Sequence, residues 1–130
     1  MGQKYILDTN TVIDYVGDKL PQISALAMDK LVNEELNISI VVKIETLGFN
    51  GEDSEMQKLK DFLSLAKIFY VEDSIAEETI NLRKLYRKLK LGDTIIAATA
   101  LTNNLTLISR NTKDFEDISG LTCINPHDLK

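Results

Sequence analysis

With 130 residues, of which 44% are hydrophobic, the chain has the length of one domain, residues 1–130, and enough apolar side chains for a core of its own. A net charge of −5 argues against a protein that coats nucleic acid through bulk electrostatics, but it does not exclude a nuclease whose acidic residues bind metal cations. Because there is one cysteine, Cys123, and no apolar run of the ~18 residues that cross a membrane, we expect a cytoplasmic protein without a disulfide framework or a membrane span.

The chain begins with a short apolar run, Tyr5 to Leu7, which ends in Asp8, Thr9 and Asn10. An apolar run without alternation is typical of a strand that is covered on both faces, and ligands collect at the carboxyl ends of strands in parallel α/β sheets. Asp8 is therefore a candidate site residue. The same polar residues also suit the cap of a following helix or an Asx-turn, so this run alone leaves both interpretations open.

Helical and strand patterns alternate along the rest of the chain. Helices are expected at 11–16, 21–31, 40–49, 53–66, 74–90 and 93–101, and further strands at 37–39, 67–71, 105–109 and 121–124. Residues 110–117 form a polar loop or a short helix. This alternation predicts an α/β domain, a three-layer α/β/α sandwich with a mostly parallel sheet of about five strands.

The expected helix at 74–90 has the most regular apolar seam. Its members follow one another in steps of four and three, at Ile75, Thr79, Leu82, Tyr86 and Leu89. Acidic residues gather at its start and basic residues at its end, namely Arg83, Lys84, Arg87, Lys88 and Lys90. The helix dipole alone explains this asymmetry.

Carboxylates from several elements are candidates for one site. In a parallel sheet Asp8 and the segment 109–114 both follow strands and emerge at the same edge, where Asp93 and Glu45 can also point. Clustered carboxylates repel one another unless a proton or a cation relieves them, and all-oxygen sites select Mg²⁺ or Mn²⁺. Such ions activate water and orient a phosphate, which is the chemistry of phosphodiester hydrolysis.

Each of these acids also has a simpler explanation. Asp93 can cap its helix, Glu45 can lie on a solvated helix face, and Asp114 can cap a turn. Periodicity and spacing do not bring the acids together.

Four segments, taken in order, carry a family resemblance: Ile-Leu-Asp-Thr-Asn at 6–10, Glu45, Lys-Leu-Gly-Asp-Thr-Ile-Ile-Ala-Ala-Thr-Ala at 90–100, and Leu-Ile-Ser-Arg-Asn-Thr-Lys-Asp-Phe at 107–115. Together they resemble the PIN-domain ribonucleases and, more narrowly, the VapC-type toxins of bacterial and archaeal toxin–antitoxin systems. The third segment is the most specific, and the resemblance covers essentially the whole chain.

The resemblance implies a PIN-like fold and a catalytic role for three acids. Asp8, Glu45 and Asp93 would hold a divalent metal, Mg²⁺ or Mn²⁺, and the attacking water. Thr9 and Asn10 would shape the turn beside Asp8. The implied reaction hydrolyses an RNA phosphodiester and leaves a 5′-phosphate and a 3′-hydroxyl.

The loop after the fourth strand departs from the family pattern. Family members often place an acid there, whereas this chain has Asn111 first and Asp114 three residues later. We expect Asp114 to assist as the fourth metal ligand, with Asn111 as a neutral ligand or a hydrogen-bond donor to the substrate. Lys88 and Arg110 are possible RNA contacts, although an ordinary surface charge is the simpler explanation for each.

The resemblance also implies partners, and two other functions remain open. A cognate antitoxin and a second copy of the chain, in a homodimer, would pack against the helices at 53–66 and 74–90. Residues 8–12 differ by one residue from the Asp-x-Asp-x-Thr/Val signature of haloacid-dehalogenase-like phosphatases, but Asn10 cannot act as their general acid. The third alternative is a PIN-fold interaction module without catalysis.

Overall fold

Five short strands form the centre of the fold in the computed structural model, which describes residues 2–130. They are β1 (Tyr5–Leu7), β2 (Asn37–Ser39), β3 (Lys67–Phe69), β4 (Thr106–Ile108) and β5 (Cys123–Ile124). The pairings are parallel, in the order β1–β4–β5 and in a separate pair β2–β3. The Asn37 side chain donates a hydrogen bond to the Tyr5 carbonyl oxygen at 2.9 Å and so joins β2 to β1. The expected parallel sheet of about five strands is confirmed.

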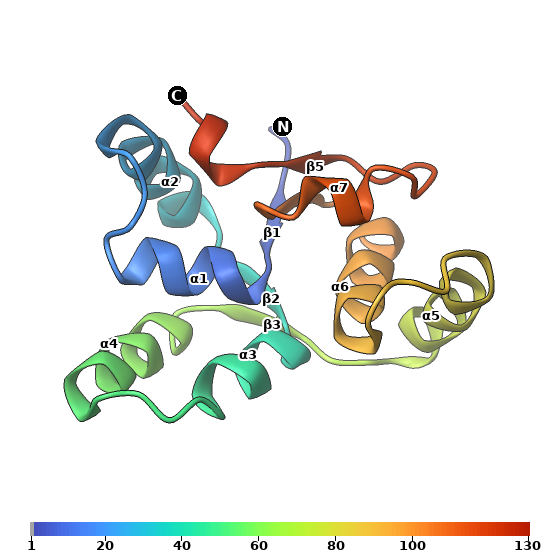
Figure 1. Cartoon of the computed structure of the whole chain (residues 1–130), viewed down its shortest axis with the longest axis horizontal. Helices are drawn as coiled ribbons and strands as arrows, with labels where there is room; N and C mark the ends of the chain where they lie inside the picture. Colours follow the sequence, from blue (N-terminus) through green and yellow to red (C-terminus); the bar gives the residue numbers. More distant parts are fainter. Residues whose placement is uncertain (1) are drawn as a thin grey trace.

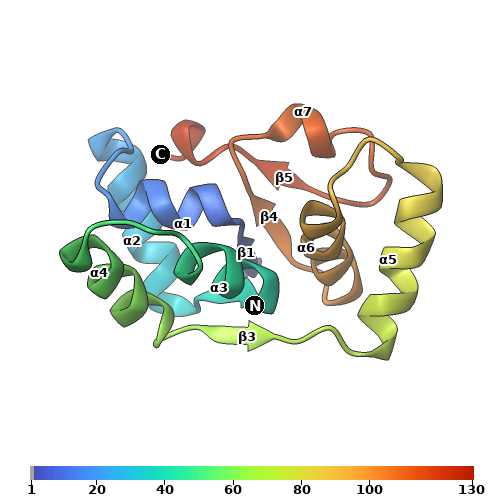
Figure 2. The same ribbon diagram turned by 60° about the horizontal axis from the view of Figure 1, so that its bottom comes forward.

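Helices cover these strands from both sides. They are α1 (Thr9–Val16), α2 (Gln22–Glu34), α3 (Ile40–Leu47), α4 (Asp53–Leu63), α5 (Asp73–Leu85), α6 (Leu91–Thr102) and α7 (Thr112–Phe115), followed by a 3-10 helix at Pro126–Asp128. Helices α1 to α4 lie on one side of the strands and α5 and α6 on the other in Figure 1, and Figure 2 keeps this separation after rotation. Within residues 2–130, no helix is both long enough and apolar enough to cross a lipid bilayer.

The strands lie in the core because their apolar residues do not alternate with polar ones. Consecutive side chains on β1 and β4 are fully buried, among them Ile6, Leu7, Leu107 and Ile108. A strand that is buried on both faces needs helices on both sides, which is the layered arrangement observed. Helix α6 packs there through small side chains at 97, 98 and 100, all of them buried alanines.

Helix α5 is shorter than its apolar seam predicts. The seam extends to Leu89, but the helix ends at Leu85 and Tyr86 takes a non-helical conformation with φ −126° and ψ 74°. The Tyr86 hydroxyl accepts a hydrogen bond from the Ser119 amide at 3.3 Å, so Tyr86 is held by a later part of the chain. Leu89 is still buried because a turn, in which its amide donates to the Tyr86 carbonyl oxygen, returns it to the core.

Two helices begin earlier than expected, and both changes affect candidate residues. Helix α1 begins at Thr9, directly after Asp8, rather than at residue 11. Helix α6 begins at Leu91 with Lys90 as its N-cap, so Gly92 lies inside the helix instead of separating two helices. Asp93 is therefore a first-turn residue and does not cap the helix.

Candidate active site

Asp8 lies at the carboxyl end of β1 and is almost completely buried, with 4% of its surface exposed. It is the N-cap of α1, and its Oδ1 accepts a hydrogen bond from the Thr11 amide at 2.9 Å. The Thr11 hydroxyl in turn donates to the Ile108 carbonyl oxygen at 2.9 Å, which ties the start of α1 to the end of β4. The cap interpretation is confirmed, and it is compatible with a site role because this bond fixes the carboxylate at the sheet edge.

Glu45 projects from α3 and is held by residues that lie beside the other two acids. The Thr9 hydroxyl donates a hydrogen bond to Glu45 Oε1 at 2.6 Å. On the other side Gly92 leaves room, because a Cβ atom there would lie 3.3 Å from Glu45 Oε2. Glu45 is exposed, as expected of a residue on a solvated helix face. Its carboxylate nevertheless lies between Thr9, which follows Asp8, and Gly92, which precedes Asp93.

Asp93 is the acid on which the charges of the other three act. Its pKa is raised above the usual range, first because the carboxyl is half-buried. The negative charges of Asp8, Glu45 and Asp114 raise this pKa further, whereas the positive charge of Lys90 lowers it. Three other elements of the fold thus bring Asp8, Glu45 and Asp114 within electrostatic reach of Asp93.

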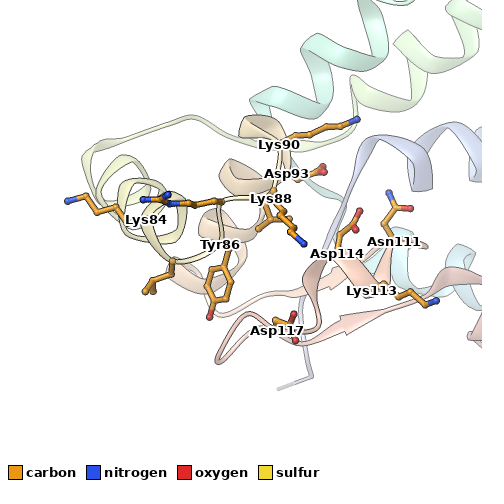
Figure 3. Close-up of a pocket in the computed structure, with 12 residues that line it drawn as sticks. Lys84, Tyr86, Lys88, Lys90, Asp93, Asn111, Lys113, Asp114 and Asp117 are labelled. Carbon is orange, nitrogen blue, oxygen red and sulfur yellow. The ribbon is translucent and has the colours of Figure 1, made fainter.

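Asn111 and Asp114 both lie in the segment that follows β4. The buried Ser109 hydroxyl oxygen accepts a hydrogen bond from the Asn111 amide at 3.1 Å, and the Asp114 amide donates to the Asn111 carbonyl oxygen at 3.0 Å. Figure 3 shows both side chains at the same cavity as Asp93. Of these two residues only Asp114 is charged, and its negative charge raises the pKa of Asp93.

The donor set of this acidic cluster suits a hard divalent cation. Among residues 2–130, no three Asp, Glu, His or Cys side chains lie close enough together to form a ready-made metal site. The acids nevertheless raise the pKa of Asp93, and a cation would relieve the repulsion that contributes to this shift. Carboxylate oxygens are the ligands that Mg²⁺ and Mn²⁺ prefer, so the residues present fit such an ion.

The two expected RNA contacts have different surroundings. Arg110 is engaged within the protein, because its Nη1 lies 3.0 Å from Oδ2 of the buried Asp14. Lys88 lines a cavity of about 820 Å³ beside Asp93. Four further cations line the same cavity: Lys84, Arg87, Lys90 and Lys113.

The sequence pattern missed several residues that build the site. The run of cations at 83–90 was a signal for a basic cavity wall, but the helix dipole explained it equally well. Thr11, Asp14 and Ser109 gave no signal, because small polar residues in such segments are common. Thr9 was expected beside Asp8, and its hydroxyl contacts Glu45. The Asn10 side chain forms no hydrogen bond within the part of the chain that the structure describes.

Comparisons with known proteins agree with this geometry. The family model described as PIN domain matches residues 5–121. The chain is 31% identical over 120 residues to Ribonuclease VapC1 of Methanocaldococcus jannaschii, an alignment that covers 87% of this chain and 79% of that protein. The family match leaves the phosphatase alternative without support.

Solved structures extend the likeness over nearly the whole chain. A toxin–antitoxin complex from Klebsiella pneumoniae contains a chain that is 31% identical, with a TM-score of 0.75, and the match covers 97% of this chain and 100% of that one. The DNA-bound VapBC of Salmonella typhimurium gives 25% identity and a TM-score of 0.79 over 96% and 99% of the two chains. PIN-domain nucleases of the VapC type depend on metal ions in general. On the family match and the identity to VapC1, the chain belongs to the PIN-domain family.

Proposed function

We propose that the chain, as a single PIN domain, is a divalent-metal-dependent ribonuclease that acts in the cytoplasm as the toxin of a toxin–antitoxin pair. The observation that carries this proposal is the convergence of four acids from separate elements beside a cavity lined by cations. The similarity to a protein named Ribonuclease VapC1 supports RNA as the substrate. Metal-dependent phosphodiester hydrolysis uses both features, an acidic site for the metal and positive charge for the substrate backbone.

In this proposal three acids from different elements hold the metal and a fourth, in the segment after β4, assists. Asp8, Glu45 and Asp93 would hold Mg²⁺ or Mn²⁺, with Asp114 as the fourth ligand. When bound, the ion supplies a water of lowered pKa and electrostatic stabilisation of the phosphate. Asp8 is a rigid ligand because it is almost completely buried and the Thr11 amide holds one of its oxygens.

The neighbouring residues orient the acids and the substrate. Thr9 fixes the carboxylate of Glu45 through its hydroxyl. Asn111 lines the cavity, and its side-chain amide forms no hydrogen bond within residues 2–130, so it is available to donate to a phosphate oxygen. Lys88 extends toward the acids in Figure 3 and would hold the phosphate next to the one that is cut.

RNA cleavage by the purified protein tests the proposal. Total cellular RNA is incubated with Mg²⁺ or Mn²⁺ and the wild type, Asp8→Asn or Asp93→Asn, and the new RNA ends are mapped. We expect 5′-phosphate and 3′-hydroxyl ends from the wild type and cleavage reduced at least a hundredfold in both variants. Asp53→Asn, which changes an exposed acid on α4, is the matched control and keeps full activity.

A non-catalytic module would give a different result. It would cut no RNA with either metal, and the two site variants would behave like the wild type. Either outcome would overturn the ribonuclease proposal.

The toxin role adds expected partners. Large apolar side chains are exposed on the surface, among them Ile44, Leu65 and Leu85, and exposed apolar surface is typical of interfaces. We propose that these surfaces serve a homodimer and a cognate antitoxin. Light scattering tests the dimer. Inducible expression in a host tests the toxicity, and we expect growth arrest with the wild type but not with Asp8→Asn.

A further inference from the structure

The cavity beside the acidic cluster is larger than metal binding and the phosphate that is cut require. Its volume of about 820 Å³ lies in the range of clefts that enclose a whole small ligand. It lies between the turn that follows α5 and the segment that contains α7. Figure 3 shows Asp93, Asn111 and Asp114 at this cavity together with Tyr86, which comes from the turn. A nucleotide next to the reacting phosphate would therefore have room here.

Charge in the cavity favours a polyanion. Five basic side chains line it against three carboxylates, although the chain as a whole has a net charge of −5. The Lys88 side chain extends toward Asp93 and Asp114 in Figure 3, whereas Lys84 and Lys113 extend away from them. Positive charge is thus spread from the acidic cluster to the outer parts of the cavity, as the track of a nucleic-acid backbone requires.

Tyr86 is the aromatic side chain among the residues that line this cavity. It is half-buried, and its hydroxyl accepts a hydrogen bond from the Ser119 amide at 3.3 Å. Its backbone has left the helical conformation of α5, which puts the residue on the turn instead of on the helix seam. The ring is thus held at both ends, by its backbone and by its hydroxyl, and it borders a space that is surrounded by cations.

We propose that this cavity binds the nucleotide that flanks the scissile phosphate and that Tyr86 stacks on its base. Positively charged grooves with aromatic side chains are the usual way in which proteins bind single-stranded nucleic acid, because every base has a face that can stack. A base that stacks on Tyr86 cannot at the same time be stacked within a duplex. The inference rests on the proposed ribonuclease function and adds to it a requirement for an unpaired nucleotide at this position.

Binding is tested without cleavage, so that failure of this inference differs from failure of the ribonuclease proposal. A set of short single-stranded RNAs, each with the fluorescent base 2-aminopurine at a different position, is titrated with the wild-type protein in EDTA. Stacking on an aromatic ring quenches this base. We expect strong quenching at one position, and weak or no binding when the same RNA is annealed to its complement.

Variants at position 86 separate stacking from packing. Tyr86→Phe keeps the ring and loses the bond to Ser119, so affinity should stay within about threefold of the wild type. Tyr86→Leu keeps apolar bulk and loses the ring, so the Kd should rise roughly tenfold or more and the quenching should disappear. In cleavage assays with metal, Tyr86→Leu should raise KM and leave kcat within about threefold. Tyr70→Leu, at an exposed tyrosine outside the cavity, is the matched control and should change neither.

Two outcomes would overturn the inference. One is a wild-type protein that binds the single strand without quenching any position, or that binds none at all. The other is a folded Tyr86→Leu variant, checked by thermal melting, with wild-type affinity. The wild-type quenching experiment decides by itself if the leucine variant does not fold.

Discussion

Removal of the Arg110 guanidinium should cost more stability than a surface charge normally does. Arg110 is 46% exposed, but Oδ2 of its partner, Asp14, lies 3.0 Å away on a side chain that is only 7% exposed. Loss of one partner from a fully buried ion pair costs about 3–5 kcal/mol, because the other charge stays buried without compensation. Since water reaches the Arg110 side of this pair, the expected cost is lower, about 2 kcal/mol.

Urea unfolding of Arg110→Ala measures this loss of unfolding free energy. In thermal unfolding the same loss should lower the melting temperature by roughly 6–10 °C. In an Asp14→Asn background the carboxylate charge is already gone, so Arg110→Ala should then cost less than about 1 kcal/mol. A loss below about 0.5 kcal/mol in the wild-type background, or additive costs in the double variant, would refute the reasoning.

The same variant distinguishes two roles for Arg110 in catalysis. The ion pair connects α1, the helix that Asp8 caps, to the segment that carries Asn111 and Asp114. If Arg110 positions that segment, Arg110→Ala should lower kcat and leave the salt dependence of RNA binding unchanged. A direct phosphate contact would instead raise KM and reduce the salt dependence.

Other positions have separate expected outcomes. Thr9→Val removes the 2.6 Å hydrogen bond to Glu45, so kcat for RNA cleavage should fall about tenfold. The free energy of unfolding should change by less than about 1 kcal/mol. An unchanged kcat would contradict this role. Gly92→Ala favours the helix by up to about 1 kcal/mol but places a Cβ atom 3.3 Å from both Glu45 Oε2 and Val41 Cγ1. The Glu45 carboxylate must then move, so RNA cleavage should fall, and thermal melting checks that the variant is folded. Asp93→Asn removes a charge that burial and neighbouring acids disfavour, so the variant should melt at a higher temperature than the wild type in EDTA at pH 7. A lower melting temperature would be evidence against the repulsion. Burial and the charge of Asp8 raise the pKa of the Cys123 thiol to about 11. Iodoacetamide at pH 8 should therefore alkylate the folded protein at least about a hundredfold more slowly than the unfolded chain. The reaction of the folded protein should become faster as the pH rises toward that pKa.

The parts of the fold that the sequence predicted are those that depend on local pattern. The unbroken apolar runs around Ile6 and Leu107 identified buried parallel strands, and the alanines of α6 identified a helix that packs closely. The end of α5 depends on a contact between Tyr86 and Ser119, 33 residues away, which no local pattern records. The pairing of Arg110 with Asp14 spans 96 residues and likewise requires the packed fold.

Glu45 shows how the local motifs and the packed fold combine in the site. It has no motif of its own, since one acid in an apolar helix is as easily a surface residue. In the structure its two carboxylate oxygens lie against residues from the two acidic motifs: Thr9, directly after Asp8, donates to one, and Gly92, directly before Asp93, leaves room for the other. The threonine and the glycine in these motifs therefore serve the third acid, on a different helix, as well as the local turn. This explains why the acid with the weakest signal in the sequence is among the most closely positioned, and why α3 must pack against the start of α1 and α6 before the site exists.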